Sequence, residues 1–244
     1  MTRIRVAHLY PDYLNIYADR GNIAVLQRRL EWRGHELEVT PVSMGDRLPA
    51  DADLFYVGGG QDREQALVAQ DLHARADELR EAVDGGIAGL AVCGGYQLLG
   101  RFYRDVAGAE LPGVGILPLH TIAGQRRMIG DVLLDCDGRA LAGFENHAGR
   151  TILDAGAEPL GRVVSGFGND GESGFERCRV GRVVGTYLHG PLLPRNPWFA
   201  DWVLEQALAH RTGEETRLEP LPDELELQAQ QVSAGRARER GGRY

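Results

Sequence analysis

Short hydrophobic runs alternate with longer helical patterns through the first part of the chain. Apolar or alternating segments predict strands at residues 4–10, 36–42, 54–57 and 87–92. Apolar residues at offsets of three and four predict helices at residues 21–32 and 62–83. This alternation is typical of a parallel sheet with covering helices. We therefore expect an α/β fold with an open, mostly parallel twisted sheet and helices on both faces.

The second half of the chain has a different pattern, richer in strands and glycine. Residues 128–134 and 179–188 predict strands, residues 143–174 hold many turn residues, and residues 198–210 predict a closing helix. Residues 233–244 are rich in Arg and Gly and too poor in apolar side chains to order themselves. We expect one domain over residues 1–220 and a C-terminal segment, 221–244, that ends in a mobile tail.

The charged residues narrow the possible chemistry. All 27 basic residues are Arg, so the chain lacks the Lys that a P-loop or a Schiff-base enzyme requires. The net charge of −8 argues against nucleic-acid binding. We expect no membrane-inserted segment, because no apolar run is long enough, and we expect no secretory signal. Three scattered cysteines suit neither a disulfide framework nor a metal site, so we expect a reduced, cytoplasmic protein without a bound metal.

The candidate nucleophile is Cys93. It follows the apolar run 87–92 and precedes Gly94, Gly95 and a predicted helix. Two glycines permit a tight strand-to-helix turn, which exposes the side chain at the end of the sheet. The N–H groups at the start of that helix favour the thiolate and could hold an oxyanion. Cys136 and Cys178 lack this context and are interpreted as buried structural cysteines.

A cysteine nucleophile usually needs a base, and His189 is the favoured candidate among seven histidines. It follows a predicted buried strand, as Cys93 does. Because the carboxyl ends of parallel strands meet at one edge of the sheet, the two residues could lie together. His8 and His120 also lie near predicted strand ends, so the pattern alone leaves them open.

Residues 90–100 (LAVCGGYQLLG) resemble the nucleophile motif of class I glutamine amidotransferases, and residues 187–190 (YLHG) are similar to the histidine motif of their cobyric acid synthase branch. Further segments resemble the glutaminase subunits of bacterial lipid II isoglutaminyl synthases. These segments are 9–15 (LYPDYLN), 19–22 (DRGN), 127–131 (RMIGD), 144–151 (FENHAGRT) and 189–197 (HGPLLPRNP). The resemblance covers roughly residues 3 to 210, and it implies a flavodoxin-like amidotransferase domain.

The resemblance implies that L-glutamine is hydrolysed to glutamate and ammonia. Cys93 would form a γ-glutamyl thioester, and His189 would protonate the departing ammonia and then activate water. Arg127 would bind the glutamine α-carboxylate. An amide from the glycine loop (Gly59 or Gly60) and that of Gly94 would form the oxyanion hole.

The resemblance also implies a partner. Ammonia would pass to a MurT-like Mur-ligase subunit in a heterodimer, and that partner would bind ATP and Mg, so no cofactor is expected in this chain. The pair would amidate the α-carboxyl of D-glutamate in the lipid II stem peptide at the inner face of the membrane. Two alternatives stay open: a cobyric acid synthase-like amidotransferase for another acceptor, and a non-catalytic scaffold of the same fold.

Three positions near the predicted site have competing interpretations. Arg126 neighbours Arg127, and the spacing to residues 129–131 favours Arg127 as the substrate-binding residue. Asn146 and His147 fall in a glycine-rich stretch interpreted as a turn, and we place them outside the site. Many class I enzymes carry a Glu two residues after the histidine; here that position is Pro191. The residue that orients His189 is left open among another carboxylate such as Asp19, a backbone carbonyl, or none.

Overall fold

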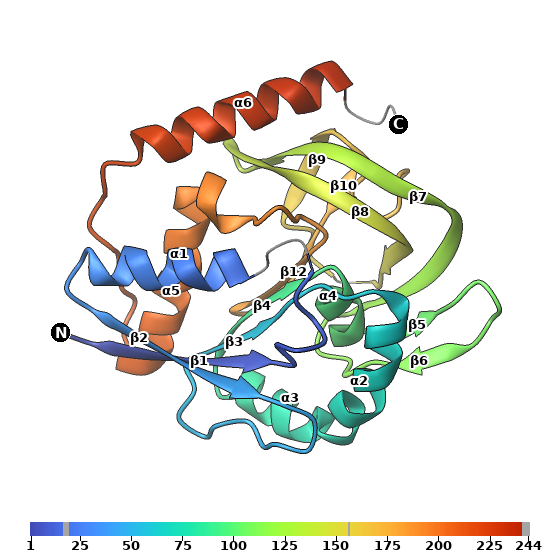
Figure 1. The fold of residues 1–244 in the computed structure, drawn as a ribbon, viewed down its shortest axis with the longest axis horizontal. Helices are drawn as coiled ribbons and strands as arrows, with labels where there is room; N and C mark the ends of the chain where they lie inside the picture. The colour runs from blue at the N-terminus through green and yellow to red at the C-terminus, as the bar shows by residue number, and fades with distance from the viewer. Residues whose placement is uncertain (17–19, 156, 241–244) are drawn as a thin grey trace.

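The computed structural model describes residues 1–16, 20–155 and 157–240, which form two β-sheets with flanking helices (Figure 1). The first sheet has the strand order β11-β12-β4-β3-β1-β2. Its strands are β1 (Arg3–Leu9), β2 (Glu36–Val42), β3 (Leu54–Val57), β4 (Ala88–Val92), β11 (Cys178–Val180) and β12 (Val183–Thr186). Neighbouring strands run parallel, except that β11 is antiparallel to β12. The predicted α/β fold with a mostly parallel sheet is confirmed.

Helices cover both faces of this sheet. α1 (Arg20–Glu31) and α5 (Pro197–Thr212) lie on one side, and α2 (Asp62–Ala74) and α3 (Ala76–Asp84) lie on the other (Figure 1). Every residue of β3 and β4 is therefore buried, as expected for central parallel strands. The edge strand β2 is largely exposed and contains Pro41, whose missing N–H is tolerated at a sheet edge.

The single long helix expected at residues 62–83 is divided in two. α2 ends at Ala74 and α3 begins at Ala76, because Arg75 leaves the helical conformation with φ −107° and ψ 19°. The break lets the chain turn beneath the sheet (Figure 1). The N-terminal turn of α2 comes directly after the loop that follows β3, where the candidate site lies.

The second sheet was not anticipated as a separate layer. It consists of β5 (Phe102–Arg104), β6 (Glu110–Pro112), β7 (Leu119–Cys136), β8 (Arg139–Leu153), β9 (Gly161–Ser165) and β10 (Phe175–Glu176). β7 and β8 form a long antiparallel hairpin with a register shift between Ala123 and Met128. The stretch interpreted as turns begins at residue 143, and its residues 143–153 lie in strand β8.

The mobile tail expected from residue 233 is wrong over its described part. Residues Glu224–Arg240 form helix α6, which packs across β7 and β8 (Figure 1). Its buried face consists of Ser233, Ala234 and Ala237, and Ser165 Oγ donates a hydrogen bond to the Ala237 carbonyl at 2.5 Å. Small side chains let the helix approach the sheet closely, so few large apolar residues are needed to order it. Residues 241–244 lie outside the described residues.

The parallel sheet explains how distant segments meet. The carboxyl ends of β3, β4 and β12 lie at one edge, and the chain leaves them at Gly58, Cys93 and Tyr187. Ligand sites in open α/β sheets form at this edge. No helix in the described part of the chain is long and apolar enough to cross a membrane.

Candidate active site

Cys93 occupies a strained turn between β4 and α4 (Gly94–Leu99). Its backbone has φ 49° and ψ −104°, a conformation that non-glycine residues rarely adopt. The turn has no room for side chains after the cysteine, because a Cβ on Gly95 would lie 2.7 Å from the carbonyl oxygen of Val57. The two glycines are therefore a packing requirement of the turn at this candidate nucleophile, as the sequence predicted.

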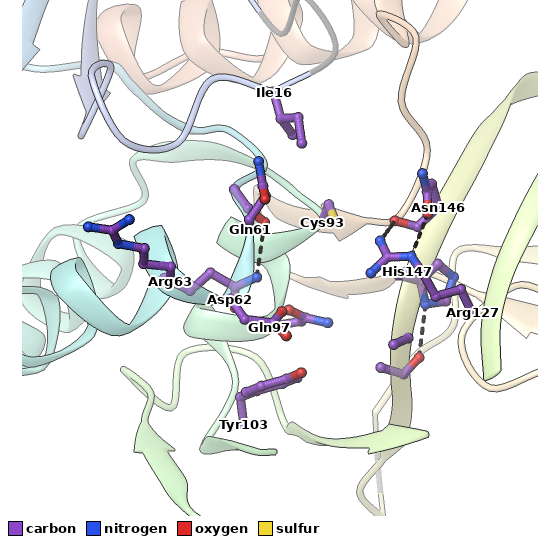
Figure 2. Close-up of a pocket in the computed structure, with 14 residues that line it drawn as sticks. Ile16, Gln61, Asp62, Arg63, Cys93, Gln97, Tyr103, Arg127, Asn146 and His147 are labelled. Atoms are coloured by element: carbon purple, nitrogen blue, oxygen red, sulfur yellow. Dashed lines mark hydrogen bonds between the residues drawn. The ribbon is translucent and has the colours of Figure 1, made fainter. Parts of the chain in front are cut away.

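A cavity of about 500 Å³ opens beside this cysteine (Figure 2). Segments from both sheets and from the start of α2 contribute to its wall. The lining residues are Ile16, Gly60, Gln61, Asp62, Arg63, Gln65, Cys93, Gln97, Tyr103, Arg127, Asn146, His147, Ala148 and Gly149. Figure 2 shows Cys93 between the Gln61 side of the cavity and the Arg127, Asn146 and His147 side. The candidate nucleophile and the predicted substrate-binding arginine therefore share one cavity.

The glycine loop after β3 approaches the nucleophile turn closely. A Cβ on Gly94 would lie 3.0 Å from the backbone nitrogen of Gly60. The Gly59 carbonyl accepts a hydrogen bond from the Ile16 N–H at 3.1 Å. Because the peptide unit is planar and trans, the Gly60 N–H of the same unit points the opposite way. The Gly60 amide nitrogen thus lies close to Gly94, whereas Gly59 contributes the carbonyl that fixes the Gly60 amide.

Arg127 lies at the irregular part of the β7–β8 hairpin. Its Nε donates to Asn146 Oδ1 at 2.9 Å, and its Nη2 donates to the Asn146 carbonyl at 3.2 Å. These bonds hold the exposed guanidinium at the cavity wall. Arg126 is not among the lining residues of the described chain, and its carbonyl accepts a bond from the Arg150 guanidinium. The geometry supports Arg127 over Arg126 as the cation that faces a substrate.

His189 follows β12 and is completely buried. Its N–H donates to the Phe144 carbonyl at 2.7 Å, and its carbonyl accepts from the Phe144 N–H at 3.3 Å. His189 thereby pairs with β8 and links the two sheets. It is not among the described residues that line the cavity, so the structure brings it to the same end of the sheet as Cys93 without placing it in the cavity wall.

A buried carboxyl group shapes the segment that leads to His189. Glu176 accepts the Tyr187 N–H at 2.7 Å and the Thr186 hydroxyl at 3.1 Å, and Thr186 Oγ1 accepts the Leu188 N–H at 3.0 Å. Burial raises the pKa of Glu176 to about 7, although the adjacent Arg177 guanidinium opposes this shift. These hydrogen bonds fix the backbone of residues 186–188, which leads directly to His189.

The interpretation of Asn146 and His147 as turn residues outside the site is wrong. Both lie on β8 and line the cavity, and Asn146 holds Arg127. His147 stacks on Tyr187 with ring centroids 3.5 Å apart. Its Nδ1 is 2.8 Å from the Gly149 carbonyl, and its Nε2 is 3.7 Å from a Glu145 oxygen. Burial lowers the pKa of His147. Both ring nitrogens face β8 groups, which disfavours His147 as the base for Cys93.

Gln97 connects the cavity to a buried polar network that sequence reasoning also missed. Its Nε2 donates to the Tyr187 hydroxyl at 3.0 Å, and the hydroxyls of Thr151 and Tyr187 are 2.6 Å apart. Burial raises the pKa of Tyr187, so this phenol stays protonated. Gln97 follows Cys93 by four residues, which places both on the same helix face. This spacing is the only sequence signal that could have indicated its place in the cavity.

Asp19, one candidate for orienting His189, lies outside the described residues. Within 1–16, 20–155 and 157–240, no group of three or more His, Cys, Asp or Glu side chains could hold a metal ion. The three cysteines are free and buried.

The fold and the cysteine turn define a class of protein, and comparison with known families supports it. Residues 5–197 match the CobB/CobQ-like glutamine amidotransferase domain. The chain belongs to this family and is a glutamine amidotransferase. Solved structures show the same fold. PurLQS from Thermotoga maritima superposes with a TM-score of 0.59 at 15% identity, covering 86% of this chain and 98% of that one. A glutamine amidotransferase from the same organism gives a TM-score of 0.54 at 16% identity, covering 96% and 95%.

Within the family, the similar relatives include subunits named GatD of lipid II isoglutaminyl synthase (glutamine-hydrolyzing). The subunit from Staphylococcus aureus is 40% identical over 239 residues, which cover 97% of each chain. The subunit from Streptococcus pneumoniae is 37% identical over 228 residues, covering 91% of this chain and 87% of the relative. A cobyric acid synthase from Synechococcus is 34% identical over 238 residues, covering 91% of this chain but 43% of that protein.

Proposed function

We propose that this chain is the glutaminase subunit of a lipid II isoglutaminyl synthase. It hydrolyses L-glutamine to glutamate and ammonia, and a MurT-like ligase subunit uses the ammonia to amidate the α-carboxyl of D-glutamate in the stem peptide, which gives D-isoglutamine. The observation that carries the proposal is the strained Cys93 in one cavity with Arg127, in a chain that matches GatD relatives over nearly its whole length.

The proposed reaction begins at the thiolate. Cys93 Sγ attacks the carboxamide carbon of glutamine, and the carbonyl oxygen becomes an oxyanion beside the amides of Gly60 and Gly94. His189 donates a proton to the amide nitrogen, ammonia leaves, and a γ-glutamyl thioester stays on Cys93. His189 then takes a proton from water as the water oxygen attacks the thioester. Breaking the C–S bond releases glutamate and regenerates the Cys93 thiolate, with His189 protonated as at the start.

Arg127 supplies the substrate-binding charge. An exposed guanidinium held by Asn146 at the cavity wall presents two N–H groups in one plane, which suits the α-carboxylate of glutamine. Because the chain contains no Lys, a guanidinium is the only permanently charged side-chain cation available for this role.

ATP-dependent activation of the acceptor carboxylate belongs to the partner in this proposal. The chain has no Lys to form a P-loop, and we assign ATP and Mg to the MurT-like subunit. The heterodimer would act in the cytoplasm at the inner face of the membrane, where the partner would bind the lipid II acceptor. In this proposal, ammonia production uses the Cys93 thiolate, the His189 imidazole, the Arg127 guanidinium and backbone amides of this chain.

The test is glutamine hydrolysis by the purified chain, alone and with the MurT-like subunit. The account expects ammonia and glutamate in equal amounts, and complete loss in Cys93→Ala with folding retained. Cys136→Ala is the matched control, because that thiol is buried away from the cavity, and it should retain activity. Ammonia release by Cys93→Ala would contradict the proposal.

A cobyric acid synthase-like role is the second candidate, favoured by 34% identity to such an enzyme over most of this chain. That relative is more than twice as long as the matched region, so it carries further parts that this chain does not match. Incubation of the chain and its ligase partner with a stem-peptide acceptor separates the candidates. Amidation supports the cell-wall role, whereas hydrolysis without amidation favours another acceptor.

A further inference from the structure

Gln65 lines the cavity, and the proposed reaction gives it no role. It lies in the first turn of α2, and its backbone N–H donates to the Gln61 carbonyl at 2.9 Å. Its side chain is only 2% exposed, although it contributes to the cavity wall. A buried amide at this place is fixed by the helix and by the loop against which it rests.

The Gln65 side chain contacts both Gly60 and Gly94, the two glycines of the proposed oxyanion hole. Its Nε2 donates to the Gly60 carbonyl at 3.2 Å. The same nitrogen lies 2.8 Å, and the amide carbon 3.0 Å, from the place where a Cβ on Gly94 would be. Gln65 therefore contacts the glycine loop and the nucleophile turn at once.

We propose that Gln65 is a positioning residue for the oxyanion hole. A glycine rotates its backbone freely, so the peptide between Gly60 and Gln61 could turn its carbonyl oxygen toward Cys93. A carbonyl dipole in that direction would repel the negative oxygen formed in the reaction. The hydrogen bond from Gln65 Nε2 holds the carbonyl away, while the bond from Ile16 to Gly59 fixes the preceding peptide. The two peptides that flank Gly60 are thus each held by one donor.

The carbonyl oxygen of the Gln65 side chain indicates that this residue serves catalysis more than stability. Its Oε1 is buried without a hydrogen-bond partner in the described chain. An unsatisfied buried acceptor destabilises a fold, whereas an apolar side chain of similar size carries no such penalty. A glutamine is suitable here because its Nε2 supplies the hydrogen bond to the Gly60 carbonyl, which an apolar side chain could not make.

The experiment compares Gln65→Met with Gln70→Met, an exposed position on the same helix. It measures glutamine hydrolysis, the rate of Cys93 alkylation by iodoacetamide, and thermal unfolding. Alkylation uses the thiolate but forms no oxyanion, so it reports whether the nucleophile turn is intact. We expect Gln65→Met to lower kcat roughly 10- to 100-fold, because a misaligned oxyanion hole costs less than a deleted donor. KM and the alkylation rate should stay within about twofold of the wild type, and the Tm should be equal or higher.

Gln65→Glu is the second variant. It keeps the shape but replaces the donor by an acceptor facing the Gly60 carbonyl, so its kcat should fall at least as far. A kcat within about twofold of the wild type in either variant would overturn the role of Gln65. A parallel loss of kcat, alkylation rate and Tm would overturn it too, since that pattern indicates a structural role. The inference rests on the proposed glutamine hydrolysis: an inactive wild type would refute both, whereas active wild type and active variants refute the role of Gln65 alone.

Discussion

The backbone N–H of Cys93 donates a hydrogen bond of 2.7 Å to the carbonyl oxygen of Thr186. This bond ties the nucleophile turn to the end of the neighbouring strand β12, three residues before His189. The proposed nucleophile and its proposed base are thus attached to adjacent parallel strands of one sheet. Their relative position depends on main-chain pairing, so it tolerates changes in nearby side chains better than a position held by loops.

His189 and His147 are distinguished by their contacts. We expect His189→Ala to lower kcat at least about 100-fold, because proton transfer to the leaving amide nitrogen and from water is lost. His147→Phe keeps a ring stacked on Tyr187 and should retain kcat within about tenfold, since its ring nitrogens face β8 groups. Steady-state kinetics and single-turnover thioester trapping measure both. The assignment is wrong if the two variants exchange these results.

Arg127 and Arg126 form a natural pair of matched variants. Arg127→Met should raise KM for glutamine roughly 10- to 100-fold, because a charge-assisted interaction of about 1.5–3 kcal/mol is removed. Arg126→Met should leave KM within about twofold, since only its carbonyl is engaged in the described structure. Equal effects of the two substitutions would contradict the placement of the substrate carboxylate at Arg127.

Helix α6 can be tested through Ala237, which is completely buried against Leu133 and Ala142 of the second sheet. Ala237→Asp should lower the free energy of unfolding by about 2–4 kcal/mol, because it buries an unpaired charge. The exposed neighbour substitution Arg238→Asp should cost less than about 0.5 kcal/mol. Urea unfolding of both variants checks this, and equal stabilities would show that α6 does not dock on β7 and β8.

The lowered pKa of His8 makes the free energy of unfolding depend on pH. Burial, aided by Arg20, lowers the pKa of His8 to about 4. The unfolded chain has a pKa near 6.5 at this residue, so it binds more protons than the native state between these values. Stability that depends on His8 is therefore complete above pH 6.5 and decreases as the pH falls toward 4.

His8→Phe removes this effect while keeping a ring against Tyr56. The variant should gain stability relative to the wild type as the pH falls from 7 to 4.5, by at most about 3 kcal/mol. Opposite contributions, such as that of Glu176 with its raised pKa, are common to both proteins and cancel in the difference. Urea unfolding at several pH values measures it, and parallel profiles would show that His8 is not held neutral by the fold.

The parallel sheet and the nucleophile turn could be predicted because their signals are local. An apolar strand followed by Cys93, Gly94 and Gly95 specifies a turn within a few residues. The position of Arg127 relied on resemblance, since the bonds that hold it come from Asn146 on another strand.

Strand β8 was missed because its glycines looked like turn formers. These positions need glycine because a larger residue would clash with segments far away in the sequence. A Cβ on Gly143 would lie 2.9 Å from Leu188, and one on Gly149 would lie 2.4 Å from Gln97 Nε2. Helix α6 was missed for a related reason, since its small buried residues give no apolar stripe. In both cases the deciding contacts are made with residues far away in the sequence.

The most direct measurement follows the nitrogen atom. The chain and the proposed MurT-like partner are incubated with ATP, a D-glutamate-containing stem-peptide acceptor and glutamine labelled with ¹⁵N in its carboxamide, and the product is analysed by mass spectrometry. The account predicts D-isoglutamine that carries ¹⁵N, with no amidated product when Cys93→Ala replaces the wild type and glutamine is the only nitrogen source. Added ammonium should restore amidation in that variant, because the ligase step does not need the thiol. Labelled product formed with Cys93→Ala, or unlabelled product formed with the wild type, would contradict the account.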